Sequence, residues 1–228
     1  MLKQEIMRVG LTIIFFISTQ YLFTGCDSTE LNDGTVSFSF YSEPASEKTT
    51  ADSIKIDSAK FILYDINIKG QSDTDTKGVK VGPFLVYINV NGMTTDFAVG
   101  NIPPGFYNQV KFEVHQLKEV EIPPDSEFVD GSLRFSAIIK GTFNAVPFVF
   151  KYQKSAHQDL KLITPIEVTQ NSIANLTIIV EPYSWFDESG VILNPNDPAN
   201  QSLIDDNIKQ SFKKIIVDNN KDGLPDWS

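Results

Sequence analysis

Apolar and polar residues alternate along several short stretches of this 228-residue chain. From Val36 to Tyr41, bulky apolar residues take every second position, and Ser or Tyr takes the positions between them. The same period of two returns in Phe84–Val90, Gln109–Val114 and Leu176–Val180. This period is typical of β-strands that turn one face to a hydrophobic core.

Two other stretches are apolar almost throughout, AKFILYDINI (59–68) and AVPFVFKY (145–152). Such runs favour central strands that are covered on both faces. Turn-rich segments, including KGQSDTDTKG (69–78) and TQNS (169–172), separate the runs. Eight to ten strands with hardly any helical period predict a mainly β fold, an antiparallel β-sandwich. The 17 phenylalanines supply bulky side chains to fill the space between two sheets.

One helix is expected near the carboxyl end. Asp197 is a suitable cap, and Pro198 suits the first helical position. Apolar residues then recur at roughly helical spacing: Leu203 or Ile204, Ile208, Phe212 and Ile215. We expect this amphipathic helix to pack its apolar face on the sandwich.

The amino end has the layout of a secretory signal. Lys3 and Arg8 provide positive charge, and the nearly unbroken apolar run 9–17 is too short to cross a bilayer comfortably. We therefore predict a signal peptide over 1–25 and a tether over 26–34. A β-sandwich domain over 35–182 follows, and an aromatic and acidic loop, a helix and a final loop over 183–228 pack on the same domain.

The end of that signal, LFTGC (22–26), resembles a bacterial lipobox, in which a lipidated cysteine follows a small pair of residues. Phe23 departs from the aliphatic residue usual at its position, but Cys26 is the chain's only cysteine. The resemblance implies that Cys26 carries acyl chains and anchors the protein to a membrane of the bacterial cell envelope, on the periplasmic side or at the cell surface. The alternatives are an ordinary signal with an incidental cysteine and a retained membrane anchor.

The stretch NIPPGFYNQVKFEV (101–114) resembles the proline–glycine turn that begins a strand in transthyretin-like (prealbumin-like) sandwiches. Together with the long segment IKIDSAKFILYDINI (54–68), it is similar in order to an uncharacterised family of bacterial lipoproteins. The resemblance covers about residues 35–182 and implies a fold and a location, without an activity.

Charge and motifs narrow the chemistry. The net charge of −10 disfavours nucleic acid and anionic lipid heads as partners, and it is compatible with divalent cations or neutral sugars. With Cys26 lipidated, no thiol remains for catalysis. The two histidines, His115 and His157, lack the spaced partners of zinc or catalytic motifs. No phosphate-binding loop or G-x-S-x-G elbow occurs. These features predict a protein without enzymatic activity.

One irregular segment, 181–202, is a candidate ligand surface. Aromatic residues and a carboxylate lie together at Tyr183, Trp185, Phe186 and Asp187. Such a set suits sugar stacking or partner recognition. Alternatively, Trp185 and Phe186 fill the open end of the sandwich. The same segment is where paired carboxylates of a sugar hydrolase would most plausibly lie.

The final stretch DNNKDGLPDWS (218–228) resembles a calcium loop. In a D-x-[DN]-x-[DN]-G alignment, positions one, three and five are oxygen donors, position seven offers a carbonyl and position nine is acidic. The predicted calcium ligands are Asp218, Asn220, Asp222, Leu224 and Asp226. Gly223 permits the bend, and the predicted helix would lead into the loop. Since position twelve falls beyond Ser228, the loop resembles the shorter dockerin-like loops more closely than a full EF-hand.

These observations predict a lipid-anchored, non-enzymatic module of the cell envelope that binds a glycan or an envelope protein and has a calcium-stabilised carboxyl end. Two alternatives stay open. One is a carbohydrate-active hydrolase with paired carboxylates. The other is a structural, fimbria-like subunit, for which an exposed edge strand would be characteristic.

Overall fold

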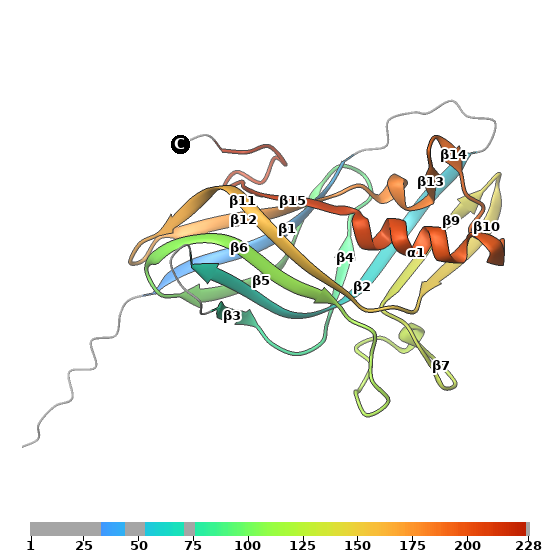
Figure 1. Cartoon of the computed structure of the whole chain (residues 1–228), viewed down its shortest axis with the longest axis horizontal. Coiled ribbons are helices and arrows are strands. Elements are labelled where there is room, and N and C mark those ends of the chain that lie inside the picture. Colours follow the sequence, from blue (N-terminus) through green and yellow to red (C-terminus); the bar gives the residue numbers. More distant parts are fainter. Residues whose placement is uncertain (1–32, 44–52, 71–75, 227–228) are drawn as a thin grey trace, which may run out of the picture. The chain divides into compact units, whose positions relative to one another are not determined.

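A computed structural model describes residues 33–43, 53–70 and 76–226, all within one compact unit, residues 31–228 (Figure 1). The predicted signal peptide and Cys26 lie outside the described residues. The strands are β1 (Gly34–Ser42), β2 (Ile54–Gly70), β3 (Thr76–Lys80), β4 (Phe84–Ile88), β5 (Thr94–Ile102), β6 (Gly105–Val114), β7 (Val129–Asp130), β8 (Leu133–Arg134), β9 (Ala137–Phe143), β10 (Val146–Tyr152), β11 (Ala156–Val168), β12 (Ile173–Val180), β13 (Asp187–Glu188), β14 (Val191–Ile192) and β15 (Phe212–Val217). One α-helix, α1 (Gln201–Gln210), and three short 3₁₀ helices, η1 (Ser126–Phe128), η2 (Pro182–Phe186) and η3 (Pro198–Asn200), complete the described elements.

Two sheets form the sandwich. The first has the strand order β15-β12-β1-β5, and the second has the order β10-β9-β2-β6-β11, with β3 and β4 also paired to β2. The short strands β7–β8 and β13–β14 form separate hairpins. The predicted mainly β fold with one helix near the carboxyl end is therefore confirmed. One difference is that β1 pairs with β12 in parallel, whereas β1 pairs with β5 in the expected antiparallel sense.

The predicted long strand is β2, which organises the second sheet. Its first half pairs with β9 and its second half with β6. The opposite edge pairs with β4 and β3. Phe61, Ile62 and Leu63 are all fully buried, because the main core covers one face of β2 and a smaller apolar cluster covers the other. Around Phe61–Leu63 this strand is covered on both faces, as its composition predicted, whereas Lys55 and Asp57 nearer its start are exposed.

The second almost wholly apolar stretch does not form a central strand. Residues 146–152 form β10, which lies at the edge of the second sheet and pairs with β9. Phe148 and Phe150 face the core, whereas Val146 and Val149 are more than half exposed. The prediction of a central strand covered on both faces is wrong for this run, since only one face is covered.

Aromatic side chains fill the space between the sheets. Phe212 of the first sheet meets Phe61 and Phe112 of the second, with ring centroids 6.0 Å and 5.5 Å apart. Phe40 stacks on Phe97 at 4.3 Å. Rings at these separations add favourable edge and offset contacts to the burial of apolar area. The core therefore joins both sheets into a single layered structure.

The proline–glycine turn before β6 is held by Tyr107. Its hydroxyl donates to the carbonyl of Pro103 at 2.8 Å, and the side chain is 4% exposed. The Tyr107 ring also lies 3.5 Å from the position that a Cβ on Gly105 would occupy. This tyrosine therefore anchors the start of β6.

The predicted helix is correct at its start and too long at its end. Asp197 caps η3 by accepting the N–H of Ala199 at 2.9 Å, and α1 continues to Gln210. Ser211 then ends the helix, with its hydroxyl donating to the carbonyl of Ile208. The next residues, FKKIIV, form β15 against β12. The β-branched residues of this stretch favour a strand, and pairing with β12 outweighs their approximate helical spacing.

The helix packs on the same core as the sheets. Ile204 and Ile208 are fully buried in the main apolar cluster. Figure 1 shows α1 beside the β13–β14 hairpin, with β15 leaving its carboxyl end. In the described part of the chain, no helix has the length and apolar character needed to cross a bilayer.

Candidate functional site

The C-terminal loop, Asp218–Asp226, follows directly from β15. The incoming element is therefore a strand, and the expectation that an EF-type helix leads into this loop is wrong. Asp218 is fully buried, and its two carboxylate oxygens accept the N–H groups of Asp222 at 3.0 Å and Gly223 at 3.1 Å. These bonds close the loop around the Asp218 carboxylate.

The other predicted calcium ligands also take part in local hydrogen bonds. Asn220 donates its amide to Asp222 Oδ2 at 3.0 Å, and Asp222 Oδ1 accepts the N–H of Leu224 at 2.8 Å. Asp226 accepts the N–H of Asn219 at 2.6 Å. Within residues 33–43, 53–70 and 76–226, no three acidic, histidine or cysteine side chains gather as a metal site. Calcium binding stays a prediction, and it requires the Asn220 amide oxygen and a main-chain carbonyl beside the aspartates.

Asn175 attaches the loop to the outer face of the first sheet. Its amide group donates to the carbonyl of Asp218 at 2.8 Å and to the hydroxyl of Thr177 at 2.9 Å. Its side-chain oxygen lies 2.8 Å from the Ser37 hydroxyl and 2.9 Å from the Ser39 hydroxyl. A main-chain bond from the Asp218 N–H to the Asn175 carbonyl, 3.0 Å long, continues the ladder beyond β15. The buried amide is therefore satisfied on every side.

This network explains why β1 alternates as it does. Val36, Phe38 and Phe40 face the core, while Ser37 and Ser39 face outward and are nevertheless buried beneath the C-terminal loop. A larger side chain at either serine would occupy the space of the loop. The small polar residues are therefore a sequence signal for a covered outer face.

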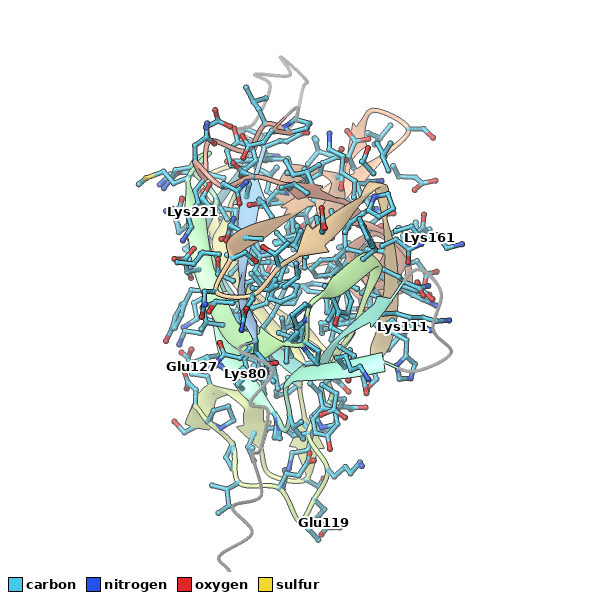
Figure 2. The ribbon with its side chains drawn as sticks, turned by 90° about the vertical axis from the view of Figure 1, so that its left-hand side faces the viewer. Lys80, Lys111, Glu119, Glu127, Lys161 and Lys221 are labelled. Atoms are coloured by element: carbon cyan, nitrogen blue, oxygen red, sulfur yellow. The ribbon has the colours of Figure 1, made fainter. Side chains whose placement is uncertain are left out.

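Lys221 ties the loop to β5. Its ammonium lies 2.5 Å from a carboxylate oxygen of Asp96, and the Thr94 hydroxyl donates to its main-chain carbonyl at 2.7 Å. The Lys221 ammonium lowers the pKa of Asp96, partial burial opposes this shift, and the Ser39 hydroxyl assists it. Figure 2 shows Lys221 at the end of the fold opposite Glu119. The ion pair joins two segments that are distant in sequence.

Gly223 brings the loop against Tyr41 of β1. Its φ of +81° lies in the left-handed region, which favours glycine. A Cβ at this position would lie 2.6 Å from three atoms of the Tyr41 ring. The close approach therefore requires glycine for two reasons, the backbone conformation and the ring beside it.

A groove of about 620 Å³ lies between the C-terminal loop and the adjoining strands. Its lining residues come from β1, β5, the turn before β5 and the loop itself: Tyr41, Gly92, Met93, Thr94, Thr95, Asp96, Lys221 and Asp222. Concave sites of about 300–1,000 Å³ are typical for small-molecule ligands. The sequence pointed to the loop, but it did not identify Tyr41 or the residues of β5 as its neighbours.

The predicted aromatic surface at residues 183–187 has a different arrangement. Trp185 and Phe186 are fully buried, so their rings offer no face to a ligand. Trp185 packs on Phe61 at 5.5 Å, and Phe186 meets Phe148 at 5.3 Å. Both rings fill the core, which is the alternative weighed from the sequence.

The two remaining residues of that set do not form an aromatic platform either. Tyr183 is partly buried and packs against the main core. Asp187 accepts the N–H of Gly190 at 2.8 Å in the β13–β14 turn. The structure thus separates this carboxylate from the buried rings, and the candidate ligand surface moves to the groove.

The two histidines lie at the carboxyl end of β6. His115 is 3% exposed, with one ring nitrogen 2.8 Å from Glu121 and the other 3.3 Å from Glu113. Its ring stacks on Tyr64 at 4.7 Å. Bonds from the Lys118 N–H and His115 lower the pKa of Glu121, although burial of this carboxylate opposes the shift. His115 therefore holds the base of the loop that carries Glu119, which extends away from the sheets in Figure 2.

Comparisons with known proteins provide little guidance. No protein-family model matches the chain, and no curated protein matches it. Among solved structures, the chain is similar to MbnP from Methylosinus trichosporium at 10% sequence identity and a TM-score of 0.44. That likeness covers 74% of this chain and 86% of that chain. The function proposed for this chain therefore rests on its own residues.

Proposed function

We propose that this chain is a lipid-anchored, non-enzymatic binding module of the bacterial cell envelope, and that the groove beside the C-terminal loop is its ligand-binding surface. The observation that carries the proposal is the construction of the groove. Segments around Tyr41, Thr95 and Lys221 converge on it, and the buried Asn175 network supports the loop wall from beneath. Side chains that are held in place before a ligand arrives reduce the entropic cost of binding it.

The charge of the groove favours binding over catalysis. A hydrolase with paired carboxylates needs one carboxyl whose pKa is raised, so that it can donate a proton. The groove holds two carboxylates, Asp96 and Asp222. The ammonium of Lys221 lowers the pKa of Asp96, which works against a role as general acid. The competing hydrolase hypothesis would be supported by release of reducing sugars from glycans.

The envelope-subunit alternative has its own structural support. β10 is an edge strand, and Val149, on the face turned away from the core, is more than half accessible. An exposed edge of this kind accepts a strand from another chain. Sedimentation of the purified protein as long assemblies would favour this alternative over a ligand-binding module.

The membrane anchor rests on the LFTGC motif and is tested at Cys26. We expect the wild-type protein to fractionate with membranes and to carry an acylated Cys26 by mass spectrometry. The Cys26→Ala protein should leave the membrane fraction. If Cys26→Ala stays membrane-bound to the same extent as the wild type, the lipid anchor is excluded.

The binding surface is tested in cells by a photo-crosslinking amino acid. Placed at Met93, an exposed residue of the groove lining, it should capture an envelope component as an adduct of increased mass. The matched control is Thr164, an exposed position on β11 away from the lining residues. Adducts from Met93 that are absent from Thr164 support the groove. Equal yields at both positions, or none at Met93, contradict it.

We also propose that calcium orders the C-terminal loop. Support comes from the position of Asp218, Asn220 and Asp222 in one tight turn, with the Leu224 carbonyl available nearby in sequence. Calcium should raise the melting temperature of the full chain in detergent, and magnesium should not. Asp222→Asn should abolish the increase, whereas Asp57→Asn on β2 should retain it. An unchanged melting temperature in wild-type protein with calcium would exclude the metal.

A further inference from the structure

Exposed apolar side chains gather at the end of the sandwich where β1 begins. Phe106, near the start of β6, is 54% exposed, and Ile163, in a bulge of β11, is 90% exposed. Ile173, the first residue of β12, is 79% exposed. Single exposed apolar residues are ordinary, but several at one end of a fold indicate a contact surface.

The strand register brings these side chains close to Gly34, the first residue of β1. Ile173 pairs with the residue that follows Gly34. Val168 lies directly against Gly34, and the residue before Val168 pairs with Phe106. The bulge that carries Ile163 lies opposite β6, two residues beyond Phe106. The three apolar side chains therefore surround the point at which the chain enters the sandwich.

Covalent geometry limits the distance between this end and the proposed lipid anchor. Cys26 precedes Gly34 by eight residues. An extended chain covers at most about 3.3–3.6 Å per residue, so a bilayer that holds acyl chains on Cys26 lies within about 29 Å of Gly34. The end of the sandwich that contains Gly34 is therefore the end that the anchor keeps near the membrane.

The opposite end of the sandwich also has exposed apolar residues, but it lies farther from the tether. Val120 and Ile122, in the loop after β6, are 90% and 88% exposed. The ten residues of β6, at about 3.3 Å each, separate that loop from the Gly34 end by about 30 Å. Figure 1 shows β1 beginning at the end of the sheets away from the β7 hairpin. Contact through this loop would require an almost fully extended tether, whereas contact through the Gly34 end does not.

We propose that the Gly34 end is a membrane-contact surface, and that Phe106, Ile163 and Ile173 enter the headgroup region of the bilayer that holds the lipid anchor. This inference rests on the proposed acylation of Cys26. Tethering makes the contact intramolecular, so a few apolar side chains suffice even though they would not hold a free protein on a bilayer. Apolar contact requires no anionic lipid, in keeping with the net charge of −10.

This contact sets the position of the groove relative to the membrane. Tyr41, in the groove lining, lies seven residues along β1 from Gly34, which is about 23 Å at the rise of a β-strand. Side chains on the outer faces of both sheets, Ile173 on the first and Phe106 on the second, make the contact, so the strands stand steeply on the bilayer. The groove is thereby held away from the lipid, where an envelope component can reach it.

The test uses the acylated full chain in phosphatidylcholine vesicles that contain a nitroxide-labelled phosphatidylcholine. Because acylation blocks the Cys26 thiol, a single new cysteine carries an environment-sensitive fluorophore. Ile163→Cys and Ile173→Cys report on the proposed contact, and Ile122→Cys is the matched control at the opposite end. We expect the first two to lose about half of their fluorescence to the nitroxide and the control to lose little. A loss at Ile122 that equals or exceeds the other two overturns the inference.

Substitutions test whether the apolar side chains hold the contact. With the fluorophore at Ile173→Cys, the double substitution Phe106→Ser and Ile163→Ser should reduce the quenching by about half or more. The control pair, Val120→Ser and Ile122→Ser, should leave the quenching unchanged. All four substituted side chains are more than half exposed, so we expect both proteins to fold, and thermal unfolding checks this. Equal quenching in the two folded proteins overturns the inference.

The lipid anchor and the membrane contact fail in distinguishable ways. If mass spectrometry finds no acyl group on Cys26, the lipid anchor is wrong and the membrane contact is wrong with it. If Cys26 is acylated but quenching at Ile163 and Ile173 does not exceed that at Ile122, the anchor stands and the membrane contact alone is wrong. Quenching confined to the Gly34 end of the acylated protein supports both.

Discussion

The ammonium of Lys221 and the carboxylate of Asp96 lie 2.5 Å apart, and this ion pair fastens the C-terminal loop to β5. Lys221→Met should loosen the loop, so the amides of residues 219–223 should exchange hydrogen faster in mass spectrometry. The loss in global stability should be about 1 kcal/mol or less, because both side chains are partly exposed. Lys161→Met on β11 is the control, and identical exchange in both variants would show that the pair does not order the loop.

Gly223→Ala should destabilise the protein more than Gly190→Ala. Both glycines have positive φ, +81° and +88°, so each alanine costs about 1 kcal/mol in backbone strain. A Cβ at Gly190 meets open space, whereas at Gly223 it lies 2.6 Å from the Tyr41 ring. The overlap should add about 1–3 kcal/mol for Gly223→Ala, measured by urea unfolding.

A double-mutant cycle tests the contact between Gly223 and Tyr41. Adding Tyr41→Ala to Gly223→Ala removes the overlap, so the double variant should recover part of the loss caused by the glycine substitution. Strictly additive losses in the double-mutant cycle would mean that the ring and the glycine do not interact in solution.

Asn175→Ala should be among the most damaging single substitutions outside the apolar core. It removes the side-chain partner of the buried Ser37 and Thr177 hydroxyls and one of the bonds to the Asp218 carbonyl, at a cost of about 3 kcal/mol. Asn196→Ala, at an exposed position, should change the free energy of unfolding by no more than about 0.5 kcal/mol. Similar effects at the two positions would contradict a structural role for the network.

Trp185→Phe should be tolerated far better than its burial suggests. The indole N–H is fully buried, and no described residue accepts its hydrogen bond. Phenylalanine removes that unsatisfied donor and retains most of the contact with Phe61, so the loss should be about 1 kcal/mol or less. Trp185→Ala should cost about 3–5 kcal/mol because it leaves a large cavity. Equal losses in thermal unfolding would imply a buried acceptor such as a water molecule.

Acid should weaken the fold through the carboxylates that contact Lys60. Its ammonium lies 2.6 Å from Asp125 and 2.8 Å from Glu127. Lys60 lowers the pKa of Asp125 from its usual 3.8, and Lys140 together with Lys60 lowers the pKa of Glu127 from 4.5. A lowered pKa in the folded state contributes stability above the unfolded pKa, and this stability is lost as the pH falls through the folded pKa.

The Lys60→Met variant tests this direction of the pH dependence. The variant should lose about 1–3 kcal/mol at pH 7, where both carboxylates are ionised in wild-type protein. The difference from wild type should shrink below the usual pKa values of 3.8 and 4.5 as the carboxylates become protonated. Urea unfolding at pH 7, 4 and 3 measures it. A difference that does not change with pH would assign the effect to packing of the lysine stem instead.

Much of the fold was predictable, because strand alternation reports directly which side chains are buried. β1 and β6 follow their patterns closely, and the middle of the long β2 is covered on both faces as expected. Periodicity does not reveal which strand lies at a sheet edge, and β10 was misassigned for that reason. Nor does it separate a helix from a strand over six residues, so FKKIIV was read as helix although pairing with β12 makes it β15.

The candidate site was only partly predictable. The spacing of Asp218, Asn220 and Asp222 indicated a tight loop, because these residue types bond to nearby N–H groups. The partners of that loop lie more than 100 positions earlier, at Asp96 and Tyr41, and a local pattern does not report such contacts. The sequence allowed Trp185 and Phe186 either to form a ligand-binding surface or to fill the core, and only the packing in the structure distinguishes the two arrangements.

The central position of β1 has a mechanical consequence. Any tension applied through the residues before Gly34 enters the fold along this strand, which is hydrogen-bonded to β12 on one edge and β5 on the other. A pull in the strand direction loads both ladders in shear, so many bonds must break together. An edge strand at the same place would instead peel away one bond at a time. A force applied through the amino end is therefore carried by β1, a strand that resists being pulled out of its sheet.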